Sequence, residues 1–129
     1  MVRRFLVTIS MMAVVGSGLA HAADDHSSQG DDQTCNQQTT VDIEQCLGRL
    51  TKAWDQRLNS AYQKLLKDNP EADKLRAAQR LWVQFRDANC RYYGAGEGTI
   101  KRLDAAECMR STTAHRALEL EQTVKGDGG

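Results

Sequence analysis

Three side chains of the types used in nucleophilic catalysis lie close together near the C-terminus of this 129-residue chain. Ser111, His115 and Glu119 are spaced four residues apart, so on a helix they share one face. A nucleophile, a base and an acid are therefore present by type. Side chains stacked along one helix usually face water, however, without the enclosed pocket and oxyanion donors that acyl transfer needs. We expect a solvated helix face and no catalytic residues; an enzyme that uses these three groups is the alternative.

Four cysteines offer a second kind of chemistry. Cys35, Cys46, Cys90 and Cys108 are separated by eleven, forty-four and eighteen positions, whereas structural zinc sites use closely spaced thiolate pairs such as C-x-x-C. The C-x-x-C-H run needed for haem attachment does not occur in the sequence. All four cysteines follow an export-type segment, and exported chains fold where disulfides persist. We expect two disulfides, no metal and no cofactor.

The first 22 residues have the features of a cleavable signal peptide. Arg3 and Arg4 give a positive start, an apolar stretch covers residues 5–19, and Ala20-His21-Ala22 has the small-x-small pattern of a cleavage site. The apolar stretch is shorter than the roughly 20 residues that span a membrane. No cysteine for lipid attachment lies at the cleavage point. We expect cleavage after Ala22 and a periplasmic or secreted protein without a membrane anchor.

Composition predicts one small domain behind a leader. Cleavage after Ala22 leaves 107 residues, with 15 basic and 17 acidic side chains and a formal charge of −2. Residues 23–34 are polar and predict a flexible acidic leader, so the domain at 35–125 is slightly basic. This balance indicates neither nucleic acid nor an anionic membrane as a partner. The acids of the leader are Asp24, Asp25, Asp31 and Asp32.

Apolar periodicity predicts three helices and no strands. The first begins at Thr39 or Thr40 and ends at Asn69-Pro70, where Asn69 caps the second helix and Pro70 takes its first position. The third helix is expected to be capped by Thr99 and to stop at Gly126. The predicted inner stripes are Ile43, Leu47, Leu50, Trp54, Leu58, Ala61 and Leu65; then Leu75, Ala78, Trp82, Phe85 and Asn89, widened by Leu81 and Tyr92; then Leu103, Ala106, Met109, Thr113, Ala117, Leu120 and Val124.

The short turn at Asn69-Pro70 predicts that the first two helices are antiparallel neighbours, with all four sulfurs at one end. Two local bridges, Cys35–Cys46 and Cys90–Cys108, fit this arrangement. The crossed pairs Cys46–Cys90 and Cys35–Cys108 fit it as well; we favour the local pairing. The expected fold is all-α, a small three-helix bundle stapled by two disulfides. Asp55 and Arg86 then fall at a similar level on facing helices, and we expect an ion pair between them, with two unpaired surface charges as the alternative.

A glycine-rich segment, residues 94–98, joins the second and third predicted helices. Its G-x-G-x-G spacing resembles a phosphate-binding loop, but such loops follow a strand and this one follows a helix. We therefore interpret it as a helix-to-helix connection. An exposed loop held near disulfides is also a suitable place to bind a partner. Its contact groups would be Tyr92, Tyr93, Gly96 and Glu97.

The run from Ala78 to Cys90, AQRLWVQFRDANC, resembles the signature of the LprI-type lysozyme-inhibitor family. The resemblance extends back to Asp55-x-x-Leu58-Asn59-x-x-Tyr62-x-x-Leu65 and forward to Arg116-x-x-x-Leu120. It implies an exported α-helical domain and inhibition of lysozyme, and it supplies no catalytic residues. The matched positions have the character of a structural set; they are Asp55, Tyr62, Gln79, Trp82, Arg86 and the four cysteines.

Together these features predict an exported, non-enzymatic binding protein. It would inhibit lysozyme, or another envelope muramidase, by occluding the active-site cleft with the exposed loop near the disulfides. The alternative is a periplasmic interaction or immunity-type protein that recognises a different target.

Overall fold

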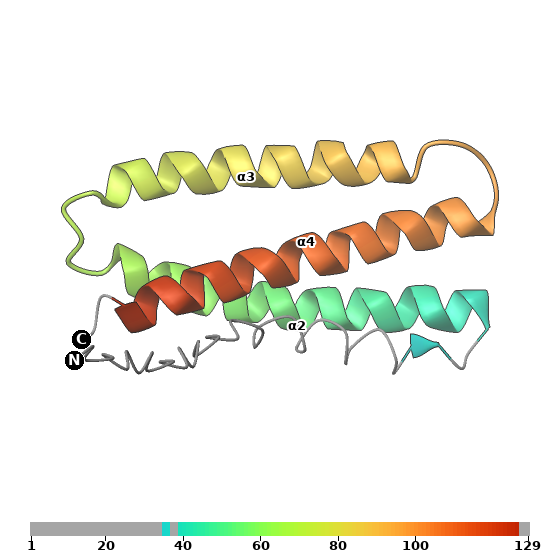
Figure 1. Cartoon of the computed structure of the whole chain (residues 1–129), viewed down its shortest axis with the longest axis horizontal. Helices are drawn as coiled ribbons and strands as arrows, with labels where there is room; N and C mark the ends of the chain where they lie inside the picture. Colours follow the sequence, from blue (N-terminus) through green and yellow to red (C-terminus); the bar gives the residue numbers. More distant parts are fainter. Residues whose placement is uncertain (1–34, 37–38, 127–129) are drawn as a thin grey trace, which may run out of the picture.

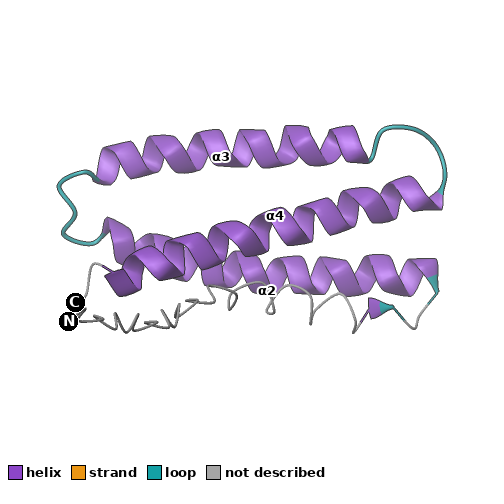
Figure 2. Cartoon of the chain, viewed as in Figure 1, coloured by secondary structure: helices purple, strands orange, loops and turns teal. Residues whose placement is uncertain are grey.

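Three long helices make up most of the computed structural model, which describes residues 35–36 and 39–126. They are α2 (Thr40–Leu66), α3 (Ala72–Tyr93) and α4 (Thr99–Gly126). Figure 2 shows helices joined by short loops and no strand in the described part of the chain, which confirms the predicted all-α class. The expected signal peptide (1–22) and leader (23–34) lie outside the described residues. No helix within residues 39–126 has the length and apolar character needed to cross a membrane.

The helix ends follow from local side-chain contacts. Thr39 caps α2: its Oγ1 accepts a hydrogen bond from the Asp42 N–H at 3.3 Å and donates one to Asp42 Oδ2 at 2.6 Å. The start of α3 differs from the prediction. Asn69 spans the turn, donating to the Leu65 carbonyl and accepting from the Glu71 N–H, each at 2.8 Å. The α3 cap position therefore falls on Glu71, and Pro70 lies in the turn.

Helix α4 is the central helix of the molecule, as Figure 1 shows. It packs along α2 and, less extensively, against α3, whereas α2 and α3 make few contacts with each other. The expectation that α2 and α3 are close neighbours is therefore wrong. Small side chains explain the position of α4, because Ala114 and Ala117 are completely buried and let its backbone approach α2 closely.

The main hydrophobic core lies between α2 and α4. The predicted α2 stripe is confirmed, since its large members Trp54 and Leu58 are 4% and 1% exposed. On α4 a charged residue outside the predicted stripe is also buried: Arg110 is 1% exposed. Its guanidinium forms a bidentate ion pair with the Glu107 carboxylate. The buried core residues are Trp54, Leu58, Ala61, Leu65, Ala114, Ala117 and Leu120.

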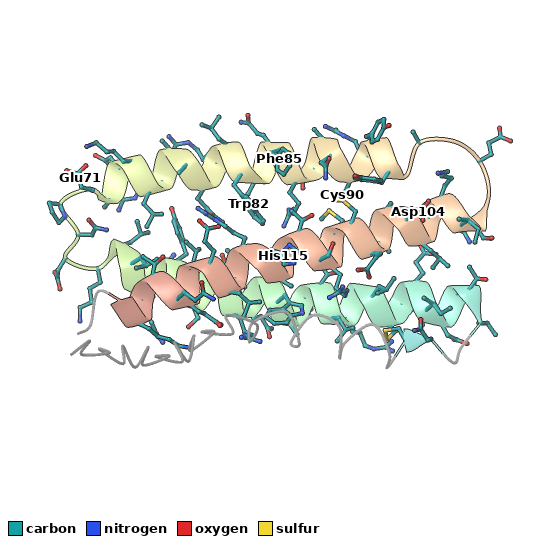
Figure 3. The ribbon with its side chains drawn as sticks, in the orientation of Figure 1. Glu71, Trp82, Phe85, Cys90, Asp104 and His115 are labelled. Carbon is teal, nitrogen blue, oxygen red and sulfur yellow. A yellow bond between two sulfur atoms is a disulfide. The ribbon has the colours of Figure 1, made fainter. Side chains whose placement is uncertain are left out.

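The disulfides have the local pairing that the sequence favoured. Cys35–Cys46 joins the segment before α2 to its first turns, and Cys90–Cys108 joins the end of α3 to α4. All four cysteines of the chain are thereby bonded. Figure 3 shows the Cys90 bridge between α3 and α4, toward the same end of the molecule as the first bridge. That end also carries the loop between α3 and α4.

Candidate functional site: the loop beside the Cys90–Cys108 disulfide

The segment from Tyr92 to Gly98, called the 92–98 loop here, consists of the last two residues of α3 and the connection to α4, and it lies at the disulfide end of the molecule. Main-chain hydrogen bonds close the helix within this segment: the Gly94 N–H donates to the Cys90 carbonyl and the Ala95 N–H donates to the Tyr92 carbonyl, both at 3.1 Å. The loop then turns through Gly96 and Gly98, whose φ angles of 109° and 99° favour glycine. The glycine spacing thus serves the turn that leads into α4.

Two constraints hold the base of this loop. The Cys90–Cys108 disulfide fixes the last turn of α3 to α4, with the two Cα atoms 5.4 Å apart. One residue beyond α3, Gly94 approaches α4 so closely that an added Cβ would lie 2.9 Å from the Cβ of Ala105. The loop is therefore presented from a rigid base. The sequence prediction missed the role of Gly94, although a glycine directly at the end of a helix is a signal for close backbone approach.

The groups that the loop presents are aromatic and acidic. Tyr92 and Tyr93 are 75% and 50% exposed, and their rings meet edge to face with centroids 5.5 Å apart. Glu97 is exposed and forms no ion pair with another described residue. The predicted contact residues Tyr92, Tyr93, Gly96 and Glu97 thus lie in one exposed segment. Chemically it offers two phenol O–H donors, two ring faces and one carboxylate.

A hollow of about 370 Å³ lies between α3 and α4 beside Tyr93. Its charged lining is acidic, but Asp104 is bonded to Lys101 at 3.2 Å and Glu107 to Arg110. The charged side chains in the wall of the hollow are therefore paired, whereas Glu97 forms no ion pair with another described residue. The remaining lining residues are Asn89, Cys108, Ser111 and Thr112.

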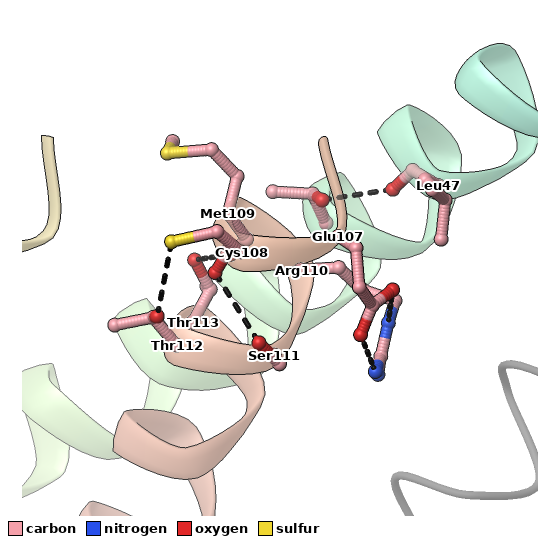
Figure 4. A network of polar contacts seen from close by, with 9 residues as sticks. Leu47, Glu107, Cys108, Met109, Arg110, Ser111, Thr112 and Thr113 are labelled. Carbon is pink, nitrogen blue, oxygen red and sulfur yellow. Dashed lines mark hydrogen bonds and ion pairs between the residues drawn. The ribbon is translucent and has the colours of Figure 1, made fainter. Parts of the chain in front are cut away.

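The hydroxyl groups near this hollow are bonded within α4, as Figure 4 shows. Ser111 Oγ donates to the Cys108 carbonyl at 3.4 Å, and Thr113 Oγ1 donates to the Met109 carbonyl at 2.7 Å. These contacts give Ser111 a main-chain partner instead of a catalytic base.

His115 and Glu119 do not complete a catalytic arrangement with Ser111. His115 is exposed, and Glu119 accepts a hydrogen bond from Arg116 at 2.6 Å. Within the described residues no hydrogen bond joins Ser111, His115 and Glu119, and no group of three acidic, histidine or cysteine side chains has metal-site geometry. The geometry gives the enzyme alternative no support.

Three family-motif residues lie where α3 meets α4. Gln79 is 9% exposed and accepts a hydrogen bond from Arg116 Nε at 3.1 Å. Trp82 lies between the two helices in Figure 3, and the Arg86 guanidinium stacks over its ring at 5.1 Å from the centroid. These positions favour a structural role for the motif.

The expected ion pair between Asp55 and Arg86 does not form. Arg86 pairs instead with its neighbour Asp87 at 2.9 Å and donates to Thr113 Oγ1 at 3.5 Å. Asp55 accepts from the Asn59 side chain on its own helix at 3.0 Å. The physical reason is the central position of α4, which keeps α2 and α3 apart. Tyr62, the other α2 motif residue, packs against the main core.

The fold and site define a small all-α domain that is stapled by two disulfides and presents an exposed loop. A model of the family described as lysozyme inhibitor LprI matches residues 31–120. The chain therefore belongs to the LprI lysozyme-inhibitor family. No curated protein and no solved structure matches it.

Proposed function

We propose that this protein is an exported, non-enzymatic inhibitor that blocks the active-site cleft of a lysozyme-type muramidase with its 92–98 loop. The observation that carries the proposal is the pair of exposed tyrosines on a loop whose base is fixed by the Cys90–Cys108 disulfide. Family membership supports an inhibitory role. The signal-like residues 1–22 and the two disulfides support export to an oxidising compartment.

The chemistry of the loop suits a glycosidase cleft. Such clefts generally hold two carboxyl groups on either side of the scissile bond. The phenol groups of Tyr92 and Tyr93 can donate hydrogen bonds to carboxylates, and their rings can fill space that sugar rings would occupy. Glu97 adds a negative charge that is available to a basic side chain at the rim of the cleft. Because the loop base is already fixed, binding costs less conformational entropy.

The test is inhibition of cell-wall lysis, measured as loss of turbidity with several lysozymes of different classes. We expect stoichiometric inhibition by the exported protein. Tyr92→Ala should raise the inhibition constant about tenfold or more, as for a buried aromatic contact, and Glu97→Gln should raise it less. The matched control is Phe85→Ala, which removes another exposed aromatic ring, 58% exposed against 75% for Tyr92, from α3 outside the loop.

Two results would contradict the proposal. One is the absence of inhibition at large molar excess with every lysozyme tested, which would point to a different envelope partner. The other is equal loss of inhibition in Tyr92→Ala and Phe85→Ala, because the loop would then have no special part in binding.

A further inference from the structure

The outward face of α3 carries an apolar stripe that neither the core nor the 92–98 loop uses. Leu81 and Phe85 are 65% and 58% exposed, and Ala78 and Ala88 beside them are also exposed. These four residues, the α3 seam, are separated alternately by three and four positions. That spacing is the a/d pattern of a helix that packs against another helix. Exposed apolar side chains in such a continuous row are typical of an interaction surface.

We propose that the α3 seam binds the α3 seam of a second copy of this chain, in antiparallel orientation. The order of side chains along the seam is small, large, large, small, so it reads the same from both ends. In an antiparallel pair an a position faces a d position of the other helix. Leu81 then lies opposite Phe85 of the second copy, and Ala78 lies opposite its Ala88. A single two-fold axis between the helices relates all of these pairs, as a closed dimer requires.

The residues beyond the seam favour the same orientation. Continuing the pattern outward by one layer places Lys74 opposite Tyr92 of the second copy, so a cation meets an exposed aromatic ring. A parallel pair would instead place Lys74 against its own copy, with like charges facing each other. Gln84 flanks the seam at the centre of the antiparallel pair, where the two amides can bond to each other. In the antiparallel register Lys74 therefore does not face its own copy.

The size of the seam predicts a weak dimer. At 22 residues, α3 is about 33 Å long, and a single helix face of this length falls near the low end of about 1,200–2,000 Å² for specific interfaces. We expect a dissociation constant on the order of micromolar. The dimer covers Tyr92 in part but leaves the loop from Tyr93 to Gly98 accessible.

The first test is sedimentation velocity of the protein as cells export it, over about a thousandfold range of concentration. We expect a reversible shift from monomer to dimer. Phe85→Asp should keep the protein monomeric over the whole range. Val83→Asp is the matched control, because it introduces the same charge on α3 outside the seam at a half-exposed apolar position, and it should dimerise like the wild type. Circular dichroism of each variant verifies that the helices are retained.

The second test is the orientation. Ala78→Cys mixed with Ala88→Cys should form an interchain disulfide under mild oxidation, since these positions face each other. Ala78→Cys alone should not, because its two copies lie about 15 Å apart along the antiparallel helices. Efficient cross-linking of Ala78→Cys to itself would contradict the antiparallel arrangement.

Other occupants of the seam give different outcomes. A protein that stays monomeric at all concentrations overturns the proposal, and binding of that monomer to phosphatidylglycerol vesicles, lost in Phe85→Asp, would assign the seam to lipid. A dimer that persists in Phe85→Asp would place the interface elsewhere. Inhibition of lysozyme by Phe85→Asp is a separate measurement, so failure of the dimer proposal leaves the proposed function standing.

Discussion

At the scale of single residues, Gly94 is a position where the chain directly after α3 closely approaches α4. An added Cβ would lie 2.9 Å from the Cβ of Ala105, and neither atom can move without its backbone. We expect Gly94→Ala to lower the free energy of unfolding by about 1–3 kcal/mol, as other overpacked sites do. Urea denaturation measures this loss.

Gly48 provides the matched control, because it lies within α2 and an added Cβ there would meet nothing within 4 Å. Gly48→Ala should raise the free energy of unfolding by about 0.5–1 kcal/mol through helix propensity alone. Adding Ala105→Gly should relieve the crowding caused by Gly94→Ala. If the changes in the free energy of unfolding caused by Gly94→Ala and Ala105→Gly simply add in the double variant, residues 94 and 105 are not in close contact.

A second residue-scale prediction concerns Glu121 and pH. The Arg57 guanidinium donates two hydrogen bonds to the Glu121 carboxylate, at 2.7 and 2.8 Å, and this contact holds the pKa of Glu121 below its ordinary value of 4.5. The stabilisation is therefore fully present above pH 4.5 and is lost as pH falls through the lower pKa of the folded state.

Glu121→Gln should accordingly lower the free energy of unfolding at pH 7 by up to about 1 kcal/mol, since the pair is partly exposed. Near pH 2 the variant and the wild type should be equally stable. Glu97→Gln, at an acid without an ion pair among the described residues, should change stability at neither pH. Chemical denaturation at the two pH values measures both variants, and a Glu121→Gln effect that persists unchanged at pH 2 would count against the ion pair.

At the scale of elements, the periodicity of apolar residues predicted the existence and approximate limits of all three helices. It also predicted the correct face of α2, because Leu47, Trp54 and Leu58 have no polar competitors on that face. It predicted the wrong face for much of α3. Phe85 and Leu81 were expected inside and are exposed, while Gln79 is buried.

The error on α3 has a physical cause. Polar side chains line the α3–α4 contact and satisfy one another, as Gln79 does with Arg116 and Arg86 with Thr113. A pattern that counts only apolar residues assigns such a face to solvent. The candidate loop was predictable from its glycines and tyrosines, but the closeness of Gly94 to Ala105 depends on how two helices meet and was not.

The two disulfides should differ in effect because only one supports the loop. Replacing both Cys90 and Cys108 by serine should lower the free energy of unfolding by about 3 kcal/mol and weaken lysozyme inhibition as well, since the base of the loop is released. Replacing Cys35 and Cys46 should lower stability by a similar amount and leave inhibition unchanged. Thermal unfolding and the turbidity assay measure the two effects. If the two double variants inhibit lysozyme equally well, the Cys90–Cys108 disulfide is not needed for the loop to inhibit.

At the scale of the whole molecule, the helices contribute unequally to stability. The buried core is built by α2 and α4, whereas α3 supplies only Gln79 and Cys90 to the buried residues. Helix α3 is therefore held by the partly buried Leu75 and Trp82, by polar contacts to α4 and by one disulfide, and its outer face is apolar. This asymmetry suits a helix that gains contacts from a second copy.

The asymmetry predicts the order in which the molecule opens. In native-state hydrogen exchange at low protein concentration, the amides of α3 should exchange faster than those of α2 and α4 near Trp54 and Ala117, because opening α3 exposes less apolar surface. Replacing Cys90 and Cys108 by serine should accelerate the exchange of the α3 amides more than that of the amides in α2 and α4. Raising the protein concentration should slow the exchange of the α3 amides selectively in the wild type, since dimer formation adds contacts to that helix alone. In Phe85→Asp the exchange of the α3 amides should not depend on concentration. Uniform exchange over all three helices would mean that the molecule opens as one cooperative unit, and that α3 is better anchored than its contacts indicate.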